Sequence, residues 1–561
     1  RALGVTRKGL AALLALEGAV IGAIGAALGT ALGLAGSAFM LRRSGADLGA
    51  GYFGGHGGVF SPDPWALGGI ALLGIAMSLA GALWVARAVG RMEIADALRD
   101  RAVDLPHDSR RAAWIAVALF AAGVPLLFAA PLAGLPLAGY AAIALWLAAS
   151  VVSVAPLCRA ILGRIVPSRN TVAALALAQV RHLPGHLAAS VAGIVVSASL
   201  AVAMAIMVHS FRVSFEGWLH GVVGADLYVR AAREGETGYF TLEEQRRIAA
   251  LPAVRAAEAV RFDRLVIDAG ATPLTLVARP VDARILEGFR AECARDGRRR
   301  PLDDCLGPRL PGDDASVWIS EAARDLHGWK PGQRIELPIA GRATAVRVAG
   351  VIRDYGRTWG AVMMPIEDYR RLTGDPRAHD LGLHLVAGAD VRATQEAIRA
   401  ALPHATGLVM EEAGEIRRRS LEIFDRSFAV TYALEAIAIV IGLAGVTSSF
   451  AALAWSRRRE FGVLRFLGLT RREILSMLAF EGAATGALGA AIGFASGAAI
   501  SLVLVRVVNR QSFHWSIEVH WPLAALAILL LGIVAACAIG ARASAAFAVR
   551  REAVLAVKED A

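Results

Sequence analysis

The sequence predicts an α-helical polytopic membrane protein that crosses the bilayer about eight times and carries one inserted extracytoplasmic α/β domain. Composition is the first reason: the 561 residues are 56% hydrophobic and 19% charged, with a mean hydropathy of +0.53. Soluble proteins average roughly 45–50% apolar and 25% charged residues. The second reason is the pattern, because long apolar stretches flank a single charge-rich segment, residues 210–426.

Eight stretches are long and apolar enough to span a bilayer, which takes roughly 20 helical residues. They lie near 10–40, 65–89, 112–131, 135–157, 187–209, 427–455, 474–505 and 521–548. None has the short apolar core and cleavage site of a signal peptide, and we expect the sequence to begin inside a longer protein.

Arginine placement predicts the orientation, because cytoplasmic loops of membrane proteins are rich in Arg and Lys. The connections 87–111 and 456–473 each hold six Arg, which makes both cytoplasmic. Residues 210–426 are then external and hold 32 basic and 32 acidic residues, so the net charge of +11 belongs to the membrane part. The basic excess is therefore a sign of membrane topology, and we expect no nucleic-acid partner.

The external segment is expected to mix strands and helices. ADLYVRA alternates like a strand, and TLEEQRRIAALP places Thr241 three residues before Glu244, which is a capping-box pattern at a helix start. SVWIS, EAARDLHGW and the run 330–356 predict a strand, a helix and a β-rich region. Helical periodicity from Glu411 to Phe428 continues into the span at 427–455, which predicts a stiff helical stalk.

An internal repeat joins the two ends of the chain. Residues Arg1–Gly33 align without a gap on Arg465–Gly497, and 18 of these 33 positions are identical. Two copies this far apart indicate a duplicated unit and not a solenoid, whose period is about 20–50 residues.

Five glycines match between the copies and predict helix packing. Within each helix they fall on an arc of about 80° at 100° per residue, and small residues on one face let transmembrane helices approach closely. We favour specific packing over chance enrichment for Gly18, Gly22, Gly25, Gly29 and Gly33, and for Gly482, Gly486, Gly489, Gly493 and Gly497.

Three carboxylates lie within predicted spans: Glu17, its repeat equivalent Glu481, and Glu435. A charged group there costs roughly 2.5–3.5 kcal/mol on insertion scales, so it needs a partner or a wet site. One interpretation makes Glu17 and Glu481 proton or substrate ligands. The interpretation that we favour has all three form structural hydrogen bonds to adjacent helices.

The cytoplasmic run SRRREFGVLRFLGLTRREI combines a basic loop with apolar residues, namely Phe461, Val463, Leu464, Phe466 and Leu467. An ordinary cytoplasmic loop explains its Arg residues but not the apolar residues between them. A surface that docks another protein explains both.

No catalytic or metal site is predicted. The chain has no G-x-x-x-x-G-K-[ST], H-E-x-x-H, C-x-x-C or G-x-S-x-G motif. Cys158 and Cys537 lie in or beside spans and are expected in the core. Cys293 and Cys305 lie in an external loop, where an oxidising compartment permits a disulfide that spacing alone cannot establish.

These residues resemble a known family. RRREFGVLRFLGLTRREILSMLAFEGAATGALGAAIG is similar to the FtsX-like permease domain of bacterial ABC transporters, and the first copy is similar from its Leu-Gly step onward. GADLYV, ISEAARDL, KPGQRI and VAGVIRDYG resemble the MacB-type periplasmic core domain. The resemblance divides the chain into a first permease unit (1–106), a linking helix pair (107–165), an amphipathic helix and span (166–209), a core domain (210–426) and a second unit (427–561).

The resemblance implies a multi-pass permease of the bacterial inner membrane, without catalytic activity or a cofactor of its own, in contact with membrane lipid. Larger members of the family have ten spans, so one or two would precede this sequence. A separate P-loop ATPase, in two copies that bind ATP and Mg, would dock on the coupling segment. Carried over by position, that segment contains Arg457, Arg458, Arg459, Glu460, Phe461, Leu464, Arg465 and Gly468, with Arg1, Leu3 and Gly4 in the first copy.

Three functions follow as hypotheses. In the leading one, ATP hydrolysis on the separate subunit moves the external domain to export or extract a lipoprotein, lipid, peptide or other amphiphile. In the alternative, the chain transmits that motion to an extracytoplasmic partner protein without transporting cargo, as FtsX does. The third, a proton-coupled transporter that uses Glu17 and Glu481, requires activity without ATP.

Overall fold

The computed structural model describes most of the chain and its side chains, with several gaps. The described residues are 6–44, 61–91, 109–132, 134–164, 174–176, 178, 185–231, 238–267, 273–295, 298–300, 315–403 and 407–548.

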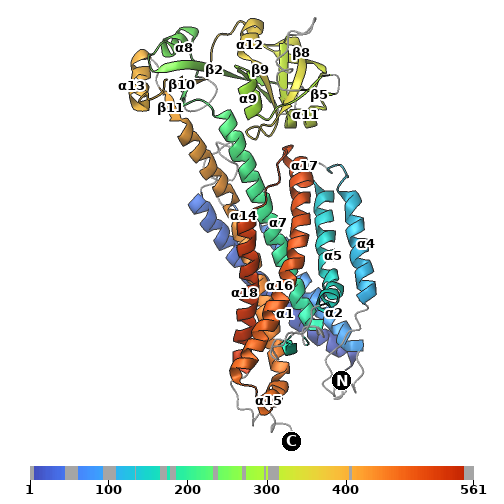
Figure 1. The fold of residues 1–561 in the computed structure, drawn as a ribbon. Helices are drawn as coiled ribbons and strands as arrows, with labels where there is room; N and C mark the ends of the chain where they lie inside the picture. Colours follow the sequence, from blue (N-terminus) through green and yellow to red (C-terminus); the bar gives the residue numbers. More distant parts are fainter. Residues whose placement is uncertain are drawn as a thin grey trace.

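A tall bundle of helices carries a mixed α/β domain at one end, and the start of α1 and the end of α18 lie at the other (Figure 1). Seven helices in the described part of the chain are long and apolar enough to cross a membrane. Six are α1 (Arg7–Ser44), α2 (Pro64–Arg91), α5 (Leu137–Leu162), α7 (Gly185–Val222), α14 (Ala413–Ser456) and α18 (Leu523–Ala548). The seventh joins α16 (Arg471–Val503), the π-helix η1 (Leu504–Val508) and α17 (Asn509–Phe513).

The expected span at 112–131 is shorter in the structure. Its helix, α4 (Ser109–Leu126), has 18 residues, contains Pro125 and ends in a turn, and it is not among the seven helices named above. Proline removes a backbone donor and disfavours a continuing helix, a local effect that a hydropathy count does not detect. α4 nevertheless lies alongside α5, where Phe120 stacks on Trp146 at 4.5 Å between ring centroids.

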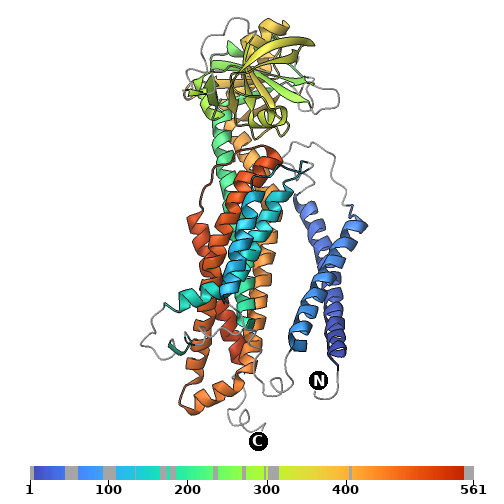
Figure 2. The ribbon, with the colours of Figure 1, turned by 90° about the vertical axis from the view of Figure 1, so that its right-hand side faces the viewer.

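The helices of the first repeat stand apart from the others. Figure 2 shows α1 and α2 crossing each other beside the remaining bundle. The hydroxyl of Ser78 on α2 donates a hydrogen bond of 2.7 Å to the Gly18 carbonyl on α1. The helices of the second repeat, by contrast, pack with α7 and α5 around α16.

Two long helices connect the bundle to the external domain. The stalk predicted from Glu411 onward is present as α14, which has 44 residues and runs without a break from the domain to the opposite end of the bundle. A second stalk was not predicted, because the span at 187–209 was expected to end at the membrane surface. α7 continues to Val222 and reaches the domain beside α14.

One eleven-stranded sheet organises the external domain, and among its described strands parallel pairing occurs only between β3 and β9 and between β6 and β8. Along the sheet its order is β11 (Val409–Glu412), β1 (Leu227–Arg230), β10 (Asp380–Leu385), β2 (Val254–Leu265), β3 (Leu274–Arg279), β9 (Ala361–Pro365), β6 (Ala315–Ser320), β8 (Arg342–Ile352), β4 (Glu292–Arg295) and β5 (Arg298–Arg300). β7 (Arg334–Ile339) pairs with β8 outside this path.

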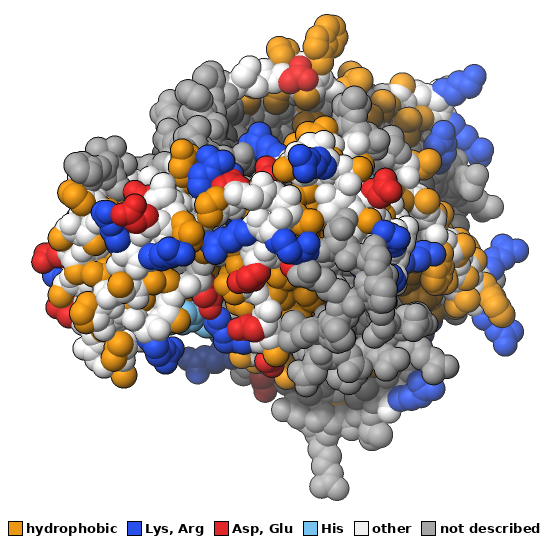
Figure 3. Space-filling view, turned by 90° about the horizontal axis from the view of Figure 1, so that it is seen from above, with side chains coloured by type: hydrophobic (Ala, Val, Ile, Leu, Met, Phe, Trp, Pro, Cys, Tyr) orange, Lys and Arg blue, Asp and Glu red, His pale blue; other side chains and the backbone are white. Residues whose placement is uncertain are grey.

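Short helices cover the sheet: α8 (Leu242–Ala249), α9 (Ala283–Gly288), α11 (Glu321–His327), α12 (Ile366–Thr373) and α13 (Val391–Ala401). The predicted capping box is present at α8, where the Thr241 side chain accepts from the Glu244 N–H and the Thr241 N–H donates to the Glu244 carboxylate at 2.7 Å. Basic and acidic side chains intermingle on the outer surface (Figure 3), as the balanced charge of 210–426 leads one to expect.

Some predictions concern residues outside the described part of the chain. These are Arg1, Leu3, Gly4 and Cys305, the side chain of Cys293, and most of the amphipathic segment at 166–187. Cys158 and Cys537 are buried free thiols, as expected of core residues.

The topology predicts that the two ends of the bundle face opposite compartments. With Cys293 and Cys305 replaced by Ser, Leu467→Cys in the turn that precedes α16 should react with an impermeant maleimide only in inverted vesicles. Val386→Cys on the external domain should react only in spheroplasts; Leu467 and Val386 are 73% and 47% exposed. Reaction of both from one side would contradict the orientation.

Candidate coupling site

A nine-residue helix, α15 (Arg458–Phe466), lies between α14 and α16 at the end of the bundle opposite the external domain (Figure 1). It is followed by Gly468 at φ +99°, a backbone conformation that favours glycine. Thr470 then caps α16 through a capping box with Glu473. The Leu-Gly-x-Thr step of the sequence is therefore the turn that sets the direction from α15 into α16.

The apolar residues of this segment divide between two faces. Phe461 is 3% exposed and packs, together with Leu464, on Ile474 and Leu478 of α16. Val463, Phe466 and Leu467, by contrast, are 53%, 66% and 73% exposed. We call these three the exposed apolar patch. Arg465 is also exposed, whereas for Arg458 and Arg459 only the backbone is described.

A buried ion pair joins the start of α15 to α16. The Arg457 guanidinium contacts the Glu481 carboxylate at 3.3 Å and the Glu460 carboxylate at 2.8 Å, and it lies over the Phe461 ring at 5.4 Å. Glu481 is 2% exposed, although one of its carboxylate oxygens has no protein partner in the described residues. Glu481 is thus paired with Arg457 in the structure.

The two other carboxylates within spans have different surroundings. Glu17, the repeat equivalent of Glu481, is exposed on α1. Glu435 is partly buried on α14. The described residues contain no group of three or more His, Cys, Asp or Glu arranged to hold a metal ion.

The glycine face of α16 brings α18 and α7 into close contact. A Cβ added to Gly482 would lie 2.6 Å from the Cys537 carbonyl oxygen of α18, and a Cβ added to Gly486 would lie 2.8 Å from the Cys537 Cβ. A Cβ added to Gly489 would lie 2.7 Å from the Ile194 side chain of α7, and a Cβ added to Gly497 would lie 2.6 Å from the Ser199 carbonyl oxygen of the same helix. Gly493 meets α7 as well, at Ala198. Separations under 3.0 Å leave no room for a side chain, so α16 is held between two helices.

In the first copy only part of the glycine face is covered. Gly18 and Gly22 pack on Ala82 and Ser78 of α2, as Gly482 and Gly486 pack on α18. Added Cβ atoms on Gly25, Gly29 and Gly33 would meet nothing within 4 Å.

At the opposite end, the loop 514–522 between α17 and α18 binds the external domain. The Tyr355 hydroxyl donates to the Ser516 carbonyl at 2.7 Å, and the Ser516 N–H donates to the Glu321 carboxylate at 2.9 Å. Glu518 accepts from Arg353 at 2.8 Å and also pairs with Arg290. We call this set of contacts the loop clamp.

The loop is also bound to α7. The Glu518 N–H donates to the Ser214 hydroxyl at 3.2 Å, and the His520 N–H donates to the Ser210 hydroxyl at 3.0 Å. An aromatic cluster fills the space where α7, α14, the loop and the domain meet, formed by Phe211, Phe215, Trp218, Tyr355, Phe424, Phe428 and Trp515.

Electrostatics favour the ionised form of Glu518. Hydrogen bonds from the Arg290 and Arg353 guanidinium groups outweigh the burial of the Glu518 carboxyl and lower its pKa to about 2. Burial raises the pKa of the Tyr355 hydroxyl to about 12, so Tyr355 stays a hydrogen-bond donor. The sequence did not predict the loop clamp, because the loop residues and their partners in the external domain lie more than 150 residues apart.

Two family models match the chain. The model of the FtsX-like permease C-terminal region matches residues 1–94 and 433–553, and the model of the MacB-like periplasmic core domain matches residues 187–401. Both copies of the repeat and the inserted domain are therefore covered.

Individual relatives agree with these matches. An uncharacterized ABC transporter permease protein of Mycobacterium tuberculosis is 28% identical over 383 residues, which cover 68% of this chain and 43% of that protein. An uncharacterized ABC transporter permease of Methanocaldococcus jannaschii is 19% identical over 199 residues, which cover 34% of this chain and 50% of that protein. The chain thus spans half or less of the length of both relatives.

A solved structure is also similar in part. The periplasmic region of MacB from Actinobacillus actinomycetemcomitans covers 36% of this chain and 94% of its own, at 11% identity and a TM-score of 0.26.

Removal of Glu481 should destabilise the bundle. Glu481→Ala leaves the mostly buried Arg457 without its buried partner, and breaking such a pair costs about 3–5 kcal/mol. Because apolar replacement of a whole buried pair is often neutral, the double change Arg457→Met with Glu481→Met should recover most of the loss. Thermal aggregation of the detergent-solubilised protein measures both effects. Glu17→Ala is the matched control, and a loss there as large as that of Glu481→Ala would contradict a special role for the buried pair.

The loop clamp should weaken in acid. In the folded protein the pKa of the Glu518 carboxyl is lowered from 4.5 to about 2. Ionised Glu518 therefore contributes its full stabilisation above pH 4.5, and this stabilisation is lost as the pH falls toward 2. Hydrogen exchange of the Glu518 and His520 amides, corrected for intrinsic rates, should therefore rise over this range. Glu518→Gln should show weaker protection already at pH 7, and parental protection at that pH would contradict the assignment.

Proposed function

We infer the function from one premise: this chain is a homologue of ABC transporter permeases that consists of FtsX-like permease regions and a MacB-like periplasmic core domain. It is a multi-pass membrane protein with an extracytoplasmic domain. We propose that it is the membrane subunit of an ABC transporter in the bacterial inner membrane. A separate ATPase, which binds ATP and Mg, would drive movement of the external domain to export or extract an amphiphilic cargo.

One observation carries this proposal: α16 is attached at both of its ends. At the cytoplasmic end, the Arg457–Glu481 pair and the packing of Phe461 bind it to α15. At the external end, it continues through η1 and α17 into the loop clamp on the domain. A displacement of α15 would therefore pass along a packed helix to the domain, and packed side chains and rigid helices are elements that carry coupling between distant sites.

The exposed apolar patch is the best candidate for the ATPase contact. Val463, Phe466 and Leu467 are exposed at the cytoplasmic end, and Arg465 lies between them in sequence. Apolar anchors with a charged rim are typical of protein interfaces. Glu460 is also exposed there, but its carboxylate is paired with Arg457. We therefore assign Glu460 an orienting role in the coupling segment and assign the direct contact to the patch.

The repeat supports two such docking surfaces. Arg1, Leu3 and Gly4 are identical to Arg465, Leu467 and Gly468, which supports a second coupling segment and a second ATPase copy. The alternative function, transmission of motion to an extracytoplasmic partner protein, uses the same connection. Crosslinking from the external domain in native membranes distinguishes them, because a protein adduct supports the alternative and a lipid or lipoprotein adduct supports transport.

Loss of the patch should release the ATPase while the chain stays in the membrane. In the full-length protein, Phe466→Asp with Leu467→Asp should lower co-purification of an ATP-hydrolysing subunit at least tenfold, because charges replace the buried centre of the interface. Phe466→Leu, which keeps an apolar side chain, is the matched control and should retain the subunit. Undiminished ATPase recovery with the double Asp variant would overturn the assignment.

A further inference from the structure

The turn between α4 and α5 presents large apolar side chains on its surface. Phe128 is 85% exposed, Leu132 is 63% exposed and Leu135 is 57% exposed. We call these three residues the hairpin tip. Residues 112–158, which hold the turn and most of both helices, contain no Asp, Glu, Lys, Arg or His. The turn also lies outside the regions that the two family models match, so the family assignment gives it no role.

The neighbouring external connection has the opposite character. Loop 514–522 carries Glu518 and binds the external domain through the loop clamp. The hairpin tip has no charged or hydrogen-bonding side chain, and its exposure shows that the described part of the domain does not cover it. Removing one Leu or Phe side chain from water is worth about 1.5–3 kcal/mol. An apolar surrounding is therefore favoured for the hairpin tip.

The depth of the turn matches the external boundary of the hydrocarbon. Two Arg residues begin α4, and Arg159 lies in the last turn of α5, which places these ends at the cytoplasmic surface. The 18 residues of α4 extend about 27 Å, against a hydrocarbon core of about 30 Å. At the turn, the Gln511 side-chain amide donates to the Ala129 carbonyl at 3.0 Å, and Gln511 lies within the candidate span Arg471–Phe513.

An apolar surface continues from α4 into the hairpin tip. Trp114, Val117 and Val124 are 74%, 58% and 39% exposed. They fall within an arc of about 80° at 100° per residue, and Phe128 follows one turn later. A face of this kind on a helix at membrane depth contacts lipid, and no charged residue interrupts it between α4 and the turn.

A turn at this depth also needs its backbone polar groups paired, because hydrocarbon offers no hydrogen-bond partner. The N–H groups of Leu132 and Leu135 donate to each other's carbonyl, both at 3.0 Å. The N–H groups of residues 127–129 donate to carbonyls three residues earlier. Pro131 and Pro136 have no N–H to pair. Most of the turn is therefore self-sufficient, which fits the boundary between hydrocarbon and headgroups.

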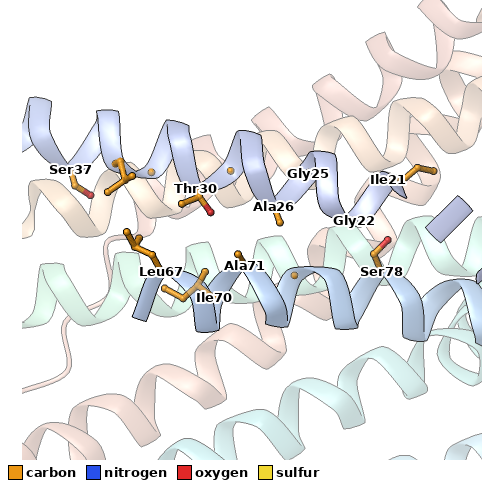
Figure 4. Close-up of a pocket in the computed structure, with 14 residues that line it drawn as sticks. Ile21, Gly22, Gly25, Ala26, Thr30, Ser37, Leu67, Ile70, Ala71 and Ser78 are labelled. Atoms are coloured by element: carbon orange, nitrogen blue, oxygen red, sulfur yellow. The ribbon is translucent and has the colours of Figure 1, made fainter. Parts of the chain in front are cut away.

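Apolar surfaces within the spans provide no such evidence. Figure 4 shows the groove of about 570 Å³ between α1 and α2, where Gly25, Ala26 and Ala71 all belong to helices. Helical backbone is hydrogen-bonded within its own segment, so lipid contact there requires no special arrangement. The paired backbone of a non-helical turn, by contrast, points to lipid at the hairpin tip.

We propose that the hairpin tip inserts into the external leaflet of the membrane, at the boundary between hydrocarbon and headgroups, with its three side chains among the acyl chains. Through the bond between Gln511 and Ala129, it holds α17 at a fixed depth. Because α17 leads into the loop clamp, the hairpin tip ties the attachment of the external domain to the lipid surface. The proposal rests on the α4–α5 hairpin and is independent of coupling to an ATPase.

Spin-label accessibility in the full-length protein, reconstituted in phosphatidylcholine liposomes, tests the proposal. Leu132→Cys carries the nitroxide, with Cys293 and Cys305 replaced by Ser. Cys158 and Cys537 are buried, and protein without the introduced cysteine measures the background. Collisions of the label with oxygen, which concentrates in hydrocarbon, are compared with its collisions with a water-soluble nickel chelate.

We expect the chelate to collide with the label at position 132 at least about fivefold less often than with a label at Val386→Cys, because polar solutes enter hydrocarbon poorly. Oxygen should collide more often at position 132. Val386 is the matched control, since it is also exposed, at 47%, and lies on the external domain. Equal access of the chelate to both positions would place the hairpin tip in water, and protection from both reagents would place it under protein. Either result overturns the proposal.

Bilayer thickness gives an independent readout. Longer acyl chains thicken the hydrocarbon, so chelate collisions at position 132 and at labelled Phe128→Cys should fall further. Collisions at position 386 should stay unchanged. Accessibility at positions 128 and 132 that does not respond to chain length would contradict contact with the acyl chains.

Discussion

Glycines on α16 let α7 and α18 approach until a side chain of one helix touches the backbone of the next. Lipid tails are as apolar as the side chains between helices, so burial alone does not hold a membrane bundle together. Dispersion contacts do, and these decline steeply when surfaces separate by even a fraction of an ångström. The absence of a Cβ at Gly489, Gly493 and Gly497 therefore fixes the position of α7, and with it one of the two stalks of the external domain.

Because α7 belongs to both the bundle and the stalk, the external domain is held at three places. α7 and α14 enter it as continuous helices, and the loop clamp binds it through Tyr355 and Glu518. An aromatic cluster fills the junction between these attachments. Such an arrangement transmits displacement better than a flexible linker would. Several of the polar bonds to the domain come from one loop, so a few residues attach the domain to the end of α17.

Patterns that are local in sequence predicted a large part of this architecture. The glycine spacing, the continuous helix from Glu411 and the Thr241 capping box each depend on neighbours within a few turns. The external domain and the repeat were recognised because their motifs are contiguous. The Arg457–Glu481 pair lies 24 residues apart, and Arg353 and Glu518 lie 165 apart. Which carboxylate meets which guanidinium across such distances is decided by tertiary packing. The division of 461–467 into a packed side and an exposed patch depends on how α15 rests on α16.

The two copies of the repeat show how much of the role of a residue comes from its surroundings. Glu481 is buried beside Arg457, whereas Glu17, in a similar local sequence, is exposed on α1. The copies differ at 15 of 33 aligned positions, yet Glu17 and all five glycines are retained. A carboxylate in a span and a bare glycine face are both unfavourable unless another group contacts them. In α16 those contacts are α15, α18 and α7, and of these only the α18 contact has a counterpart among the described neighbours of α1. The residues retained in α1 are thus the ones whose equivalents in α16 contact α15, α18 or α7. The second copy therefore shows which kinds of contact these residues can make.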